Sequence, residues 1–378
     1  MLIKGGQVFD LKEGFVSRDL CTEGENLSET STDGVTYDVD GCYVIPGLVE
    51  VHFHGAVGED FSDGDAAGLQ KIADFELSEG VTHMCPTGMT LLEPELTALC
   101  RTAAAHRKNN TGGADLVGVH LEGPFLSYAK RGAQNGDVLH TPDVEMLRRL
   151  QAEAEGCVKL VTVAPEEPGG IEFIKAATAD GIHVSLGHTT ANYDVAAAAY
   201  AAGADHATHL YNAMPPLHHR DPGVIGAAAE DPKVFAELIC DGIHIHPSTV
   251  RATFEMFGPE RMVIISDSLR AAGMPDGIYP FGGQEIEVHG NLATIYGHPE
   301  TLAGSVTSLM GCMRKAVEFG IPLTDAVRAC TYNPAKSIGM EDRIGSLEPG
   351  KEASFVVLNP DLTLKAVVFH GKIAVGEL

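Results

Sequence analysis

The stretch IPGLVEVHFHG, residues 45–55, joins a short apolar run to two histidines and a closing glycine. Its length and β-branched content predict a buried strand over 43–52. Side chains alternate along an extended chain, so His52 and His54 project to the same side and can bind one ion. A hydrogen-bonded pair of histidines on the rim of a sheet produces the same pattern, and both interpretations stay open.

Seven more apolar runs follow, and stretches with helical periodicity lie between them. This alternation is typical of a parallel sheet with helical crossovers. The expected strands are 43–52, 82–85, 116–121, 158–163, 182–186, 206–209, 235–239 and 262–266, with helices over 65–78, 93–108, 143–155, 170–179 and 192–202. Eight such units without a GxGxxG signal predict an α/β fold of the (β/α)8 TIM-barrel type. A hairpin over 281–296 and helices over 305–318 and 324–330 are expected after the last strand.

The two ends of the chain differ from its middle. Residues 2–42 and 345–378 consist of short, turn-rich β segments, and neither end is long enough to bury a core alone. We therefore expect one small β-sandwich domain built from residues 1–42 and 345–378. The barrel would then span residues 43–344.

The composition limits the partners that the protein can have. Its formal net charge is −26, from 52 acidic and 26 basic residues. A chain this acidic repels nucleic acid and anionic membranes, so neither is expected as a partner, and an anionic substrate would need local positive contacts. The chain starts without a signal-peptide pattern, and no window is apolar enough for a membrane span. Eight cysteines are scattered without a CxxC pair. These features favour a cytoplasmic protein with reduced thiols.

Residue types that bind metals follow several of the other expected strands. Glu122 comes directly after the third strand, His188 follows the fifth, and His209 closes the sixth. The carboxyl ends of barrel strands meet at one mouth, so these side chains are expected to share one ion. A carboxylate with two imidazoles suits Zn²⁺ or Fe²⁺. Taken singly, each residue has an ordinary structural explanation.

Asp267 follows the eighth strand at the same expected mouth. An N-cap for the next helix would explain an aspartate there. The functional interpretation is a general base that takes a proton from a metal-activated water molecule and later returns it to a leaving amine.

Six longer motifs surround these positions in a fixed order. They are HLEGPF at 120–125, GHT at 187–189, THLYNAM at 208–214, RDPG at 220–223, DGIH at 241–244 and LAGS at 302–305. On these motifs the chain resembles the N-acetylglucosamine-6-phosphate deacetylases of the amidohydrolase superfamily, and the resemblance runs essentially from end to end. It implies a hydrolase that removes the N-acetyl group from a 6-phosphorylated amino sugar and releases acetate and the free amine.

The resemblance also implies roles for particular residues. Glu122, His188 and His209 match metal ligands, and Asp267 matches the catalytic acid and base. The positions that match substrate-binding residues are Ala133, Asn212, Ala213, Arg220, Asp241, His244, Leu302, Ala303 and Gly304.

The phosphate of a phosphorylated N-acetyl amino sugar would lie against Arg220 and His244, because a guanidinium group suits a phosphate fork. In the family this phosphate site borrows residues across a subunit interface, so a homodimer is implied.

The implied cofactor is one or two zinc or iron ions per subunit. The fourth strand ends at Val163-Ala-Pro165, without the lysine that many binuclear amidohydrolases carboxylate. Glu122 is then the available bridging carboxylate. With both His52 and His54 present, a second metal site bridged by Glu122 is one interpretation, and an ordered rim is the other.

Two departures from the family pattern leave the sugar open. Gln134 stands where family members commonly have a histidine, at a position expected near the sugar hydroxyls, and Arg270 adds a cation after Asp267. Both keep N-acetylgalactosamine 6-phosphate as an alternative substrate. More distant alternatives are an amidohydrolase that acts on cyclic amides or N-acyl amino acids, and a non-catalytic sugar-phosphate sensor.

Overall fold

The structure is a computed structural model that describes residues 1–31 and 34–378. Its central feature is a sheet of seven parallel strands in the order β12-β14-β15-β16-β17-β18-β19, which curls into a half-barrel. The strands are β12 (Thr87–Gly88), β14 (Val119–Glu122), β15 (Val158–Val163), β16 (His183–Leu186), β17 (His206–Ala207), β18 (Phe235–Ile239) and β19 (Met262–Ile265). The predicted α/β class and parallel strand arrangement are therefore confirmed.

A second parallel sheet, in the order β13-β11-β8, contains β8 (Leu48–Glu50), β11 (Val81–Met84) and β13 (Asp115–Leu116). The expected strand 116–121 is divided between the two sheets, because the chain breaks at Gly118. A Cβ atom on Gly118 would lie 2.6 Å from Lys159 Cγ and 2.9 Å from Cys85 Sγ, so only glycine fits this close approach.

The first expected strand, 43–52, is also divided. Its first half, β7 (Tyr43–Pro46), pairs with strands from the chain ends, whereas β8 pairs with β11. The break falls at Gly47, where a Cβ atom would lie 2.0 Å from Thr82 Oγ1. His52 lies two residues beyond the end of β8, so the expected strand extended too far.

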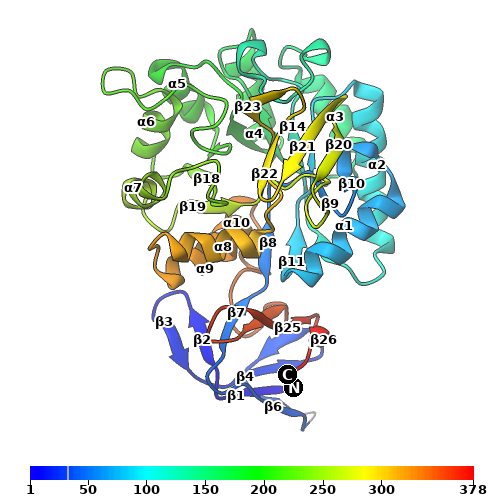
Figure 1. Ribbon diagram of the computed structural model, residues 1–378, viewed down its shortest axis with the longest axis vertical. Helices are drawn as coiled ribbons and strands as arrows, with labels where there is room; N and C mark the ends of the chain where they lie inside the picture. The colour runs from blue at the N-terminus through cyan, green and yellow to red at the C-terminus, as the bar shows by residue number, and fades with distance from the viewer. Residues whose placement is uncertain (32–33) are drawn as a thin grey trace.

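Helices connect the parallel strands and flank them in Figure 1. They are α1 (Ala66–Ser78), α2 (Glu93–Asn109), α3 (Val144–Glu153), α4 (Gly170–Ala179), α5 (Tyr193–Ala202), α6 (Gly223–Glu230) and α7 (Pro247–Phe257). Three of them begin one residue later than predicted, because the first expected residue is the N-cap. Asp65, Asp143 and Asn192 each accept backbone N–H groups of the first turn with a side-chain oxygen.

Strands from the two ends of the chain lie side by side at the bottom of Figure 1. They form one sheet in the order β26-β25-β24-β7-β2-β3 and another in the order β5-β4-β1-β6. The bounds are β1 (Leu2–Lys4), β2 (Gln7–Asp10), β3 (Gly14–Ser17), β4 (Leu20–Glu23), β5 (Asn26–Ser28), β6 (Thr36–Asp38), β24 (Phe355–Leu358), β25 (Leu364–Phe369) and β26 (Lys372–Gly376). Ile3 and Val8 from one end pack in the same apolar cluster as Phe355 and Val368 from the other.

An antiparallel sheet of four strands is inserted after β19. It consists of β20 (Gly277–Phe281), β21 (Gln284–His289), β22 (Leu292–Ile295) and β23 (His298–Leu302). The expected hairpin over 281–296 is wrong in extent, because it includes only the two inner strands. The outer strand β23 is largely exposed and polar, so its sequence carries no apolar signal. Helices α8 (Leu309–Glu318), α9 (Leu323–Cys330) and α10 (Tyr332–Ser337) follow.

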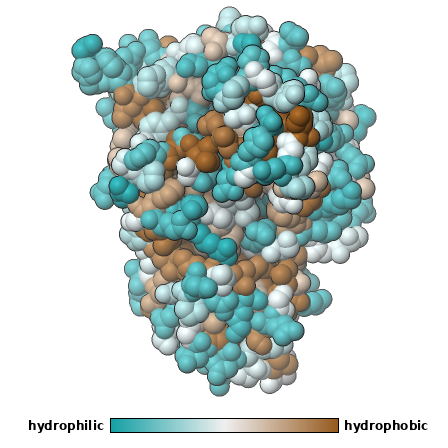
Figure 2. All heavy atoms as spheres, in the orientation of Figure 1, coloured by the Kyte–Doolittle hydropathy of each residue, from teal (hydrophilic) through white to brown (hydrophobic). Residues whose placement is uncertain are grey.

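Hydrophilic residues cover most of the face drawn in Figure 2. Within the described ranges, no helix combines the length and hydropathy that a membrane crossing needs. All eight cysteines are free thiols, and only Cys21 is not buried.

Candidate active site

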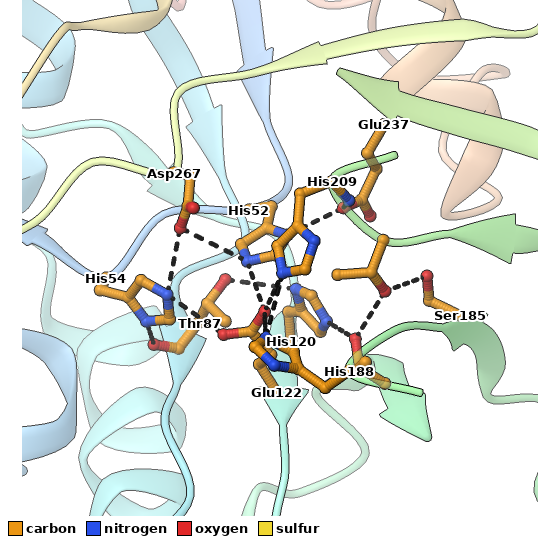
Figure 3. Close-up of polar contacts among 12 residues, drawn as sticks. His52, His54, Thr87, His120, Glu122, Ser185, His188, His209, Glu237 and Asp267 are labelled. Atoms are coloured by element: carbon orange, nitrogen blue, oxygen red, sulfur yellow. Dashed lines mark hydrogen bonds and ion pairs between the residues drawn. The ribbon is translucent and has the colours of Figure 1, made fainter. Parts of the chain in front are cut away.

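Glu122, His188 and His209 meet near the carboxyl ends of β14, β16 and β17 (Figure 3). Glu122 Oε1 lies 3.1 Å from His188 Nε2 and 3.0 Å from His209 Nε2, and the two Nε2 atoms are 3.1 Å apart. All three side chains are buried. The structure thus brings together three residues that are up to 87 positions apart in the sequence.

The hydrogen bonds of His188 fix which nitrogen faces this cluster. Its Nδ1 lies 2.9 Å from the carbonyl oxygen of Lys130, which can only accept, so Nδ1 carries the hydrogen. In the neutral ring, Nε2 then holds a lone pair directed at Glu122 Oε1. A lone pair and a carboxylate oxygen at 3.1 Å repel each other unless a proton or a metal cation lies between them. This donor set therefore fits a divalent metal ion.

His52 and His54 are oriented in the same way. His52 Nδ1 donates to Glu237 Oε2 at 2.8 Å, and His54 Nδ1 donates to the carbonyl oxygen of Thr87 at 3.1 Å. Their Nε2 atoms each lie 3.3 Å from Glu122, His52 at Oε1 and His54 at Oε2. Both histidines therefore lie in the same cluster as Glu122, His188 and His209. With Asp267 they form a second group that could hold an ion, with Glu122 between the two groups.

The pKa values of the clustered side chains show that their carboxylates stabilise positive charge on the histidines. Burial lowers the pKa of His54, but hydrogen bonds to Asp267 and Glu122 outweigh burial and raise this pKa to about 10. Burial raises the pKa of Glu122, yet the neighbouring His52 and His188 hold it well below its usual range. The carboxylates are therefore charged, and a metal ion that binds here would displace protons from the imidazoles.

Asp267 follows β19 and lines a cavity that opens over this cluster. Its Oδ1 lies 3.3 Å from His54 Nε2 and 3.7 Å from His52 Nε2. Burial raises the pKa of Asp267, but the hydrogen bond to His54 and the nearby His52 lower it overall. The carboxylate is ionised and can accept a proton. Asp267, His188 and His209 all have positive φ, at 49°, 46° and 28°, and such strained conformations cluster at functional sites.

Two fully buried glutamates hold this cluster in place, and the sequence interpretation missed both. Glu50 Oε1 accepts the backbone N–H of His52 at 3.1 Å, and Oε2 accepts that of Ser266 at 2.9 Å. Burial raises the pKa of Glu50 to about 7. Glu237 accepts from His52 Nδ1 and from the backbone N–H of His209. The available signal was a single acidic residue inside each apolar run, LVEV at 48–51 and FAELI at 235–239.

A cavity of about 380 Å³ opens over the cluster. Most of the expected substrate-binding positions line it, namely Ala133, Asn212, Ala213, His244, Leu302 and Gly304. Asp241 holds His244, because its Oδ2 accepts from His244 Nδ1 at 2.8 Å. Burial lowers the pKa of His244, but Asp241 raises it overall. A charged His244 suits an anionic ligand.

The three other expected substrate-binding residues, Asp241, Ala303 and Arg220, do not line the cavity. Ala303 is fully buried and does not line the cavity. Arg220 lies on an exposed loop outside the cavity lining, and its Nη1 is 2.7 Å from His219 Nε2. Within the described part of one chain, the structure therefore does not bring Arg220 to the cluster.

The two departures from the family pattern contact protein groups. Gln134 lines the cavity, where it was expected to lie near the sugar hydroxyls, and its Nε2 donates to Glu122 Oε2 at 2.7 Å. Arg270 does not line the catalytic cavity, and its Nη2 pairs with Asp63 at 2.9 Å and Asp60 at 3.6 Å. Its charge is neutralised away from the cluster.

Comparison with known proteins agrees with this geometry. The amidohydrolase family model matches residues 43–374. The N-acetylglucosamine-6-phosphate deacetylase of Bacillus subtilis is 38% identical over 88% of this chain and 84% of its own length. The N-acetylgalactosamine-6-phosphate deacetylase of Escherichia coli O157:H7 is 34% identical over 89% of this chain and 88% of its own. The solved N-acetyl-D-glucosamine-6-phosphate deacetylase of Mycobacterium smegmatis superposes with a TM-score of 0.92, at 31% identity over 99% of both chains. The chain belongs to the amidohydrolase family and, within it, to the N-acetylglucosamine-6-phosphate deacetylases.

Proposed function

We infer that the protein hydrolyses N-acetylglucosamine 6-phosphate to glucosamine 6-phosphate and acetate. Two of the relatives named above, from Bacillus subtilis and Mycobacterium smegmatis, carry this activity in their names, at 38% and 31% identity over most of the chain. The observation that carries the inference is the cluster of imidazole Nε2 atoms and carboxylates beneath a cavity of about 380 Å³. That cavity is large enough for a phosphorylated hexosamine.

We propose that Glu122, His188 and His209 hold a divalent ion, zinc or iron, and that His52, His54 and Asp267 offer a second site. The orientation of His188, His52 and His54 supports both assignments: each ring has its Nδ1 hydrogen engaged elsewhere, so its Nε2 faces Glu122 and is free to bind an ion once it carries no proton. A bound ion supplies Lewis acidity to the acetyl carbonyl and lowers the pKa of water towards about 7.

Asp267 moves the proton in this mechanism. Water attacks the acetyl carbon, and the ionised Asp267 accepts a proton from that water. Asp267 then donates the proton to the amide nitrogen as the C–N bond breaks, because an unprotonated amine is a poor leaving group. Acetate and the free amine result. The low pKa of Asp267 and its place on the cavity wall support this role.

The sugar is proposed to lie along the cavity wall formed by Ala133, Asn212, Ala213, Leu302 and Gly304. His244 would contact the substrate. We also propose that Arg220 contacts the phosphate in a homodimer, in which its exposed loop faces the mouth of a cavity. The exposure of Arg220 supports its availability to a second subunit.

At the level of the fold, we propose that the two parallel sheets are arcs of one (β/α)8 barrel, and that the terminal sheets form a separate small β-sandwich domain. Hydrogen bonds from His54 N and Gly55 N to Ser268 O, beyond the ends of β8 and β19, support closure of the barrel. The free, mostly buried thiols support a reducing, cytoplasmic compartment.

The competing substrate is N-acetylgalactosamine 6-phosphate, the substrate class named for the Escherichia coli relative. Gln134 both lines the cavity and binds Glu122, so its presence does not by itself favour either sugar. Acetate release by the zinc-loaded and iron-loaded protein should be measured with both epimers under steady-state conditions. We expect kcat/KM at least tenfold higher for the gluco sugar, and a tenfold preference for the galacto sugar would overturn the assignment.

A further inference from the structure

The amide of Gln134 has only one orientation that satisfies its neighbours. Its Oε1 accepts the backbone N–H of Thr90 at 2.8 Å, and its Nε2 donates to Glu122 Oε2 at 2.7 Å. Exchanging the two amide atoms would place NH₂ against an N–H donor and oxygen against a carboxylate. The side chain is buried, so water does not compete for these bonds.

The two oxygens of Glu122 have different partners. Oε1 lies 3.0–3.1 Å from His188 and His209 and 3.3 Å from His52, whereas Oε2 lies 2.7 Å from Gln134 and 3.3 Å from His54. The terminal torsion of a glutamate side chain is soft and broadly distributed. A fixed external donor therefore holds Oε2 on the side of Gln134 and His54 and keeps Oε1 towards His188, His209 and His52.

Thr90 links Gln134, the donor, to the backbone of Glu122. Thr90 Oγ1 donates to the backbone oxygen of Glu122 at 3.4 Å. The following Gly123 approaches Thr90 so closely that a Cβ atom there would lie 2.2 Å from Thr90 Oγ1. Thr90 thus ties the backbone of Glu122 directly and its carboxylate through Gln134.

We propose that Gln134 is a positioning residue that fixes the carboxylate of Glu122 for metal binding, and so sets the affinity of the site for its ion. The proposal rests on the metal-ligand role inferred for Glu122. Partners that orient metal ligands typically contribute about 10- to 100-fold in affinity.

The test uses Gln134→Met, which keeps the length of the side chain, stays neutral and removes the donor. The matched control is Gln284→Met, since Gln284 Nε2 donates to the neighbouring Ala133 O at 3.0 Å but lies on the exposed side of the same region. Zinc affinity is measured by chelator competition, and the coordination geometry by the visible absorption of the cobalt-substituted protein. We expect Gln134→Met to weaken zinc binding about 10- to 100-fold and to change the cobalt spectrum, with Gln284→Met within about twofold of wild type.

Wild-type affinity together with an unchanged cobalt spectrum in Gln134→Met would overturn the proposal. If that variant fails to fold, Gln134→Asn serves instead, because its shorter amide cannot reach both partners, and the same two outcomes decide. The Glu122→Gln variant separates the positioning role of Gln134 from the metal-ligand role of Glu122 on which it rests. If Glu122→Gln loses zinc and Gln134→Met keeps wild-type affinity, only the positioning role is refuted. If Glu122→Gln keeps zinc, the ligand assignment of Glu122 is itself refuted.

Discussion

At the scale of single residues, the chemistry depends on which nitrogen of each histidine carries a hydrogen. His52, His54 and His188 donate their Nδ1 hydrogens to a carboxylate, a carbonyl and another carbonyl, respectively. Each ring is thereby rotated so that Nε2 faces Glu122. This arrangement prepares the ligands before an ion binds, which reduces the reorganisation that binding requires.

The Asp267→Asn variant tests the proton carrier. An amide of the same size cannot accept the proton from water, so kcat should fall by about 10²- to 10⁴-fold. Because the pKa of Asp267 is lowered, the wild-type enzyme should keep this base active down to acidic pH. Steady-state acetate release across pH measures both effects. Zinc content at the Glu122 site should be unchanged, and a variant within threefold of wild-type kcat would exclude Asp267 as the base.

At the scale of elements, the Glu50 side chain links β8 and β19, which do not pair with each other through backbone hydrogen bonds. Strands β8 and β19 lie in different sheets and share no ladder. The carboxylate of Glu50 accepts backbone N–H groups from just beyond both strands, one on each oxygen. Asp267 N also donates to His52 O at 3.0 Å. The positions of the first and last candidate ligands are thus coupled.

Glu50→Gln should disturb this junction. The amide offers one acceptor and one donor, so one of the two N–H groups would face NH₂ and lose its partner. We expect a loss of roughly 1–3 kcal/mol in the free energy of unfolding, measured by urea denaturation of the metal-loaded protein. The exposed substitution Glu172→Gln is the control, and equal stability of the two variants would contradict the bridging role.

Asp205 joins the amino ends of β16 and β17 by a different kind of contact. It accepts from His183 Nδ1 at 2.6 Å and from His206 Nδ1 at 2.7 Å. Burial raises the pKa of Asp205, but His206 and His183 hold it well below its usual range. Burial lowers the pKa of His206, but Asp205 raises it overall.

Because of these pKa shifts, Asp205→Asn should lower the free energy of unfolding by an amount that depends on pH. The carboxylate contribution is present above its ordinary pKa of about 4 and is lost only as pH falls through the lowered folded value. The His206 contribution is full below about 6.5 and is lost as pH rises through the raised folded value. Urea unfolding should show a destabilisation of roughly 2 kcal/mol at pH 5.5 that shrinks at pH 9. A pH-independent difference, or one matched by the exposed control Asp19→Asn, would contradict this account.

Some elements could be predicted from the sequence and others could not. The apolar runs at 158–163 and 235–239 are strands with those same bounds, because a buried strand requires a continuous apolar segment. The breaks at Gly47 and Gly118 were not predictable, since they depend on side chains of neighbouring strands. The candidate ligands were found because they follow strand ends. Glu50, Glu237 and the contact of Gln134 were missed because their partners are distant in sequence.

At the scale of the whole molecule, a chain with a net charge of −26 is proposed to bind an anion. The cavity supplies local positive charge for this, since His244 and Lys130 both line it and Asp241 raises the pKa of His244. Hydrophilic residues cover most of the face seen in Figure 2. The acidic chain disfavours anions elsewhere on the molecule, whereas His244 and Lys130 offer local positive contacts within the cavity.

The most direct test of the account is acetate release from N-acetylglucosamine 6-phosphate by protein stripped of metal and then reloaded. The imidazole and carboxylate groups around Glu122 can activate water only with a divalent ion among them. We predict that the stripped protein loses at least 99% of kcat, roughly the 10²-fold expected for such a group, and that zinc or ferrous iron restores it. Full activity in the stripped protein, verified to be free of metal, would contradict the account.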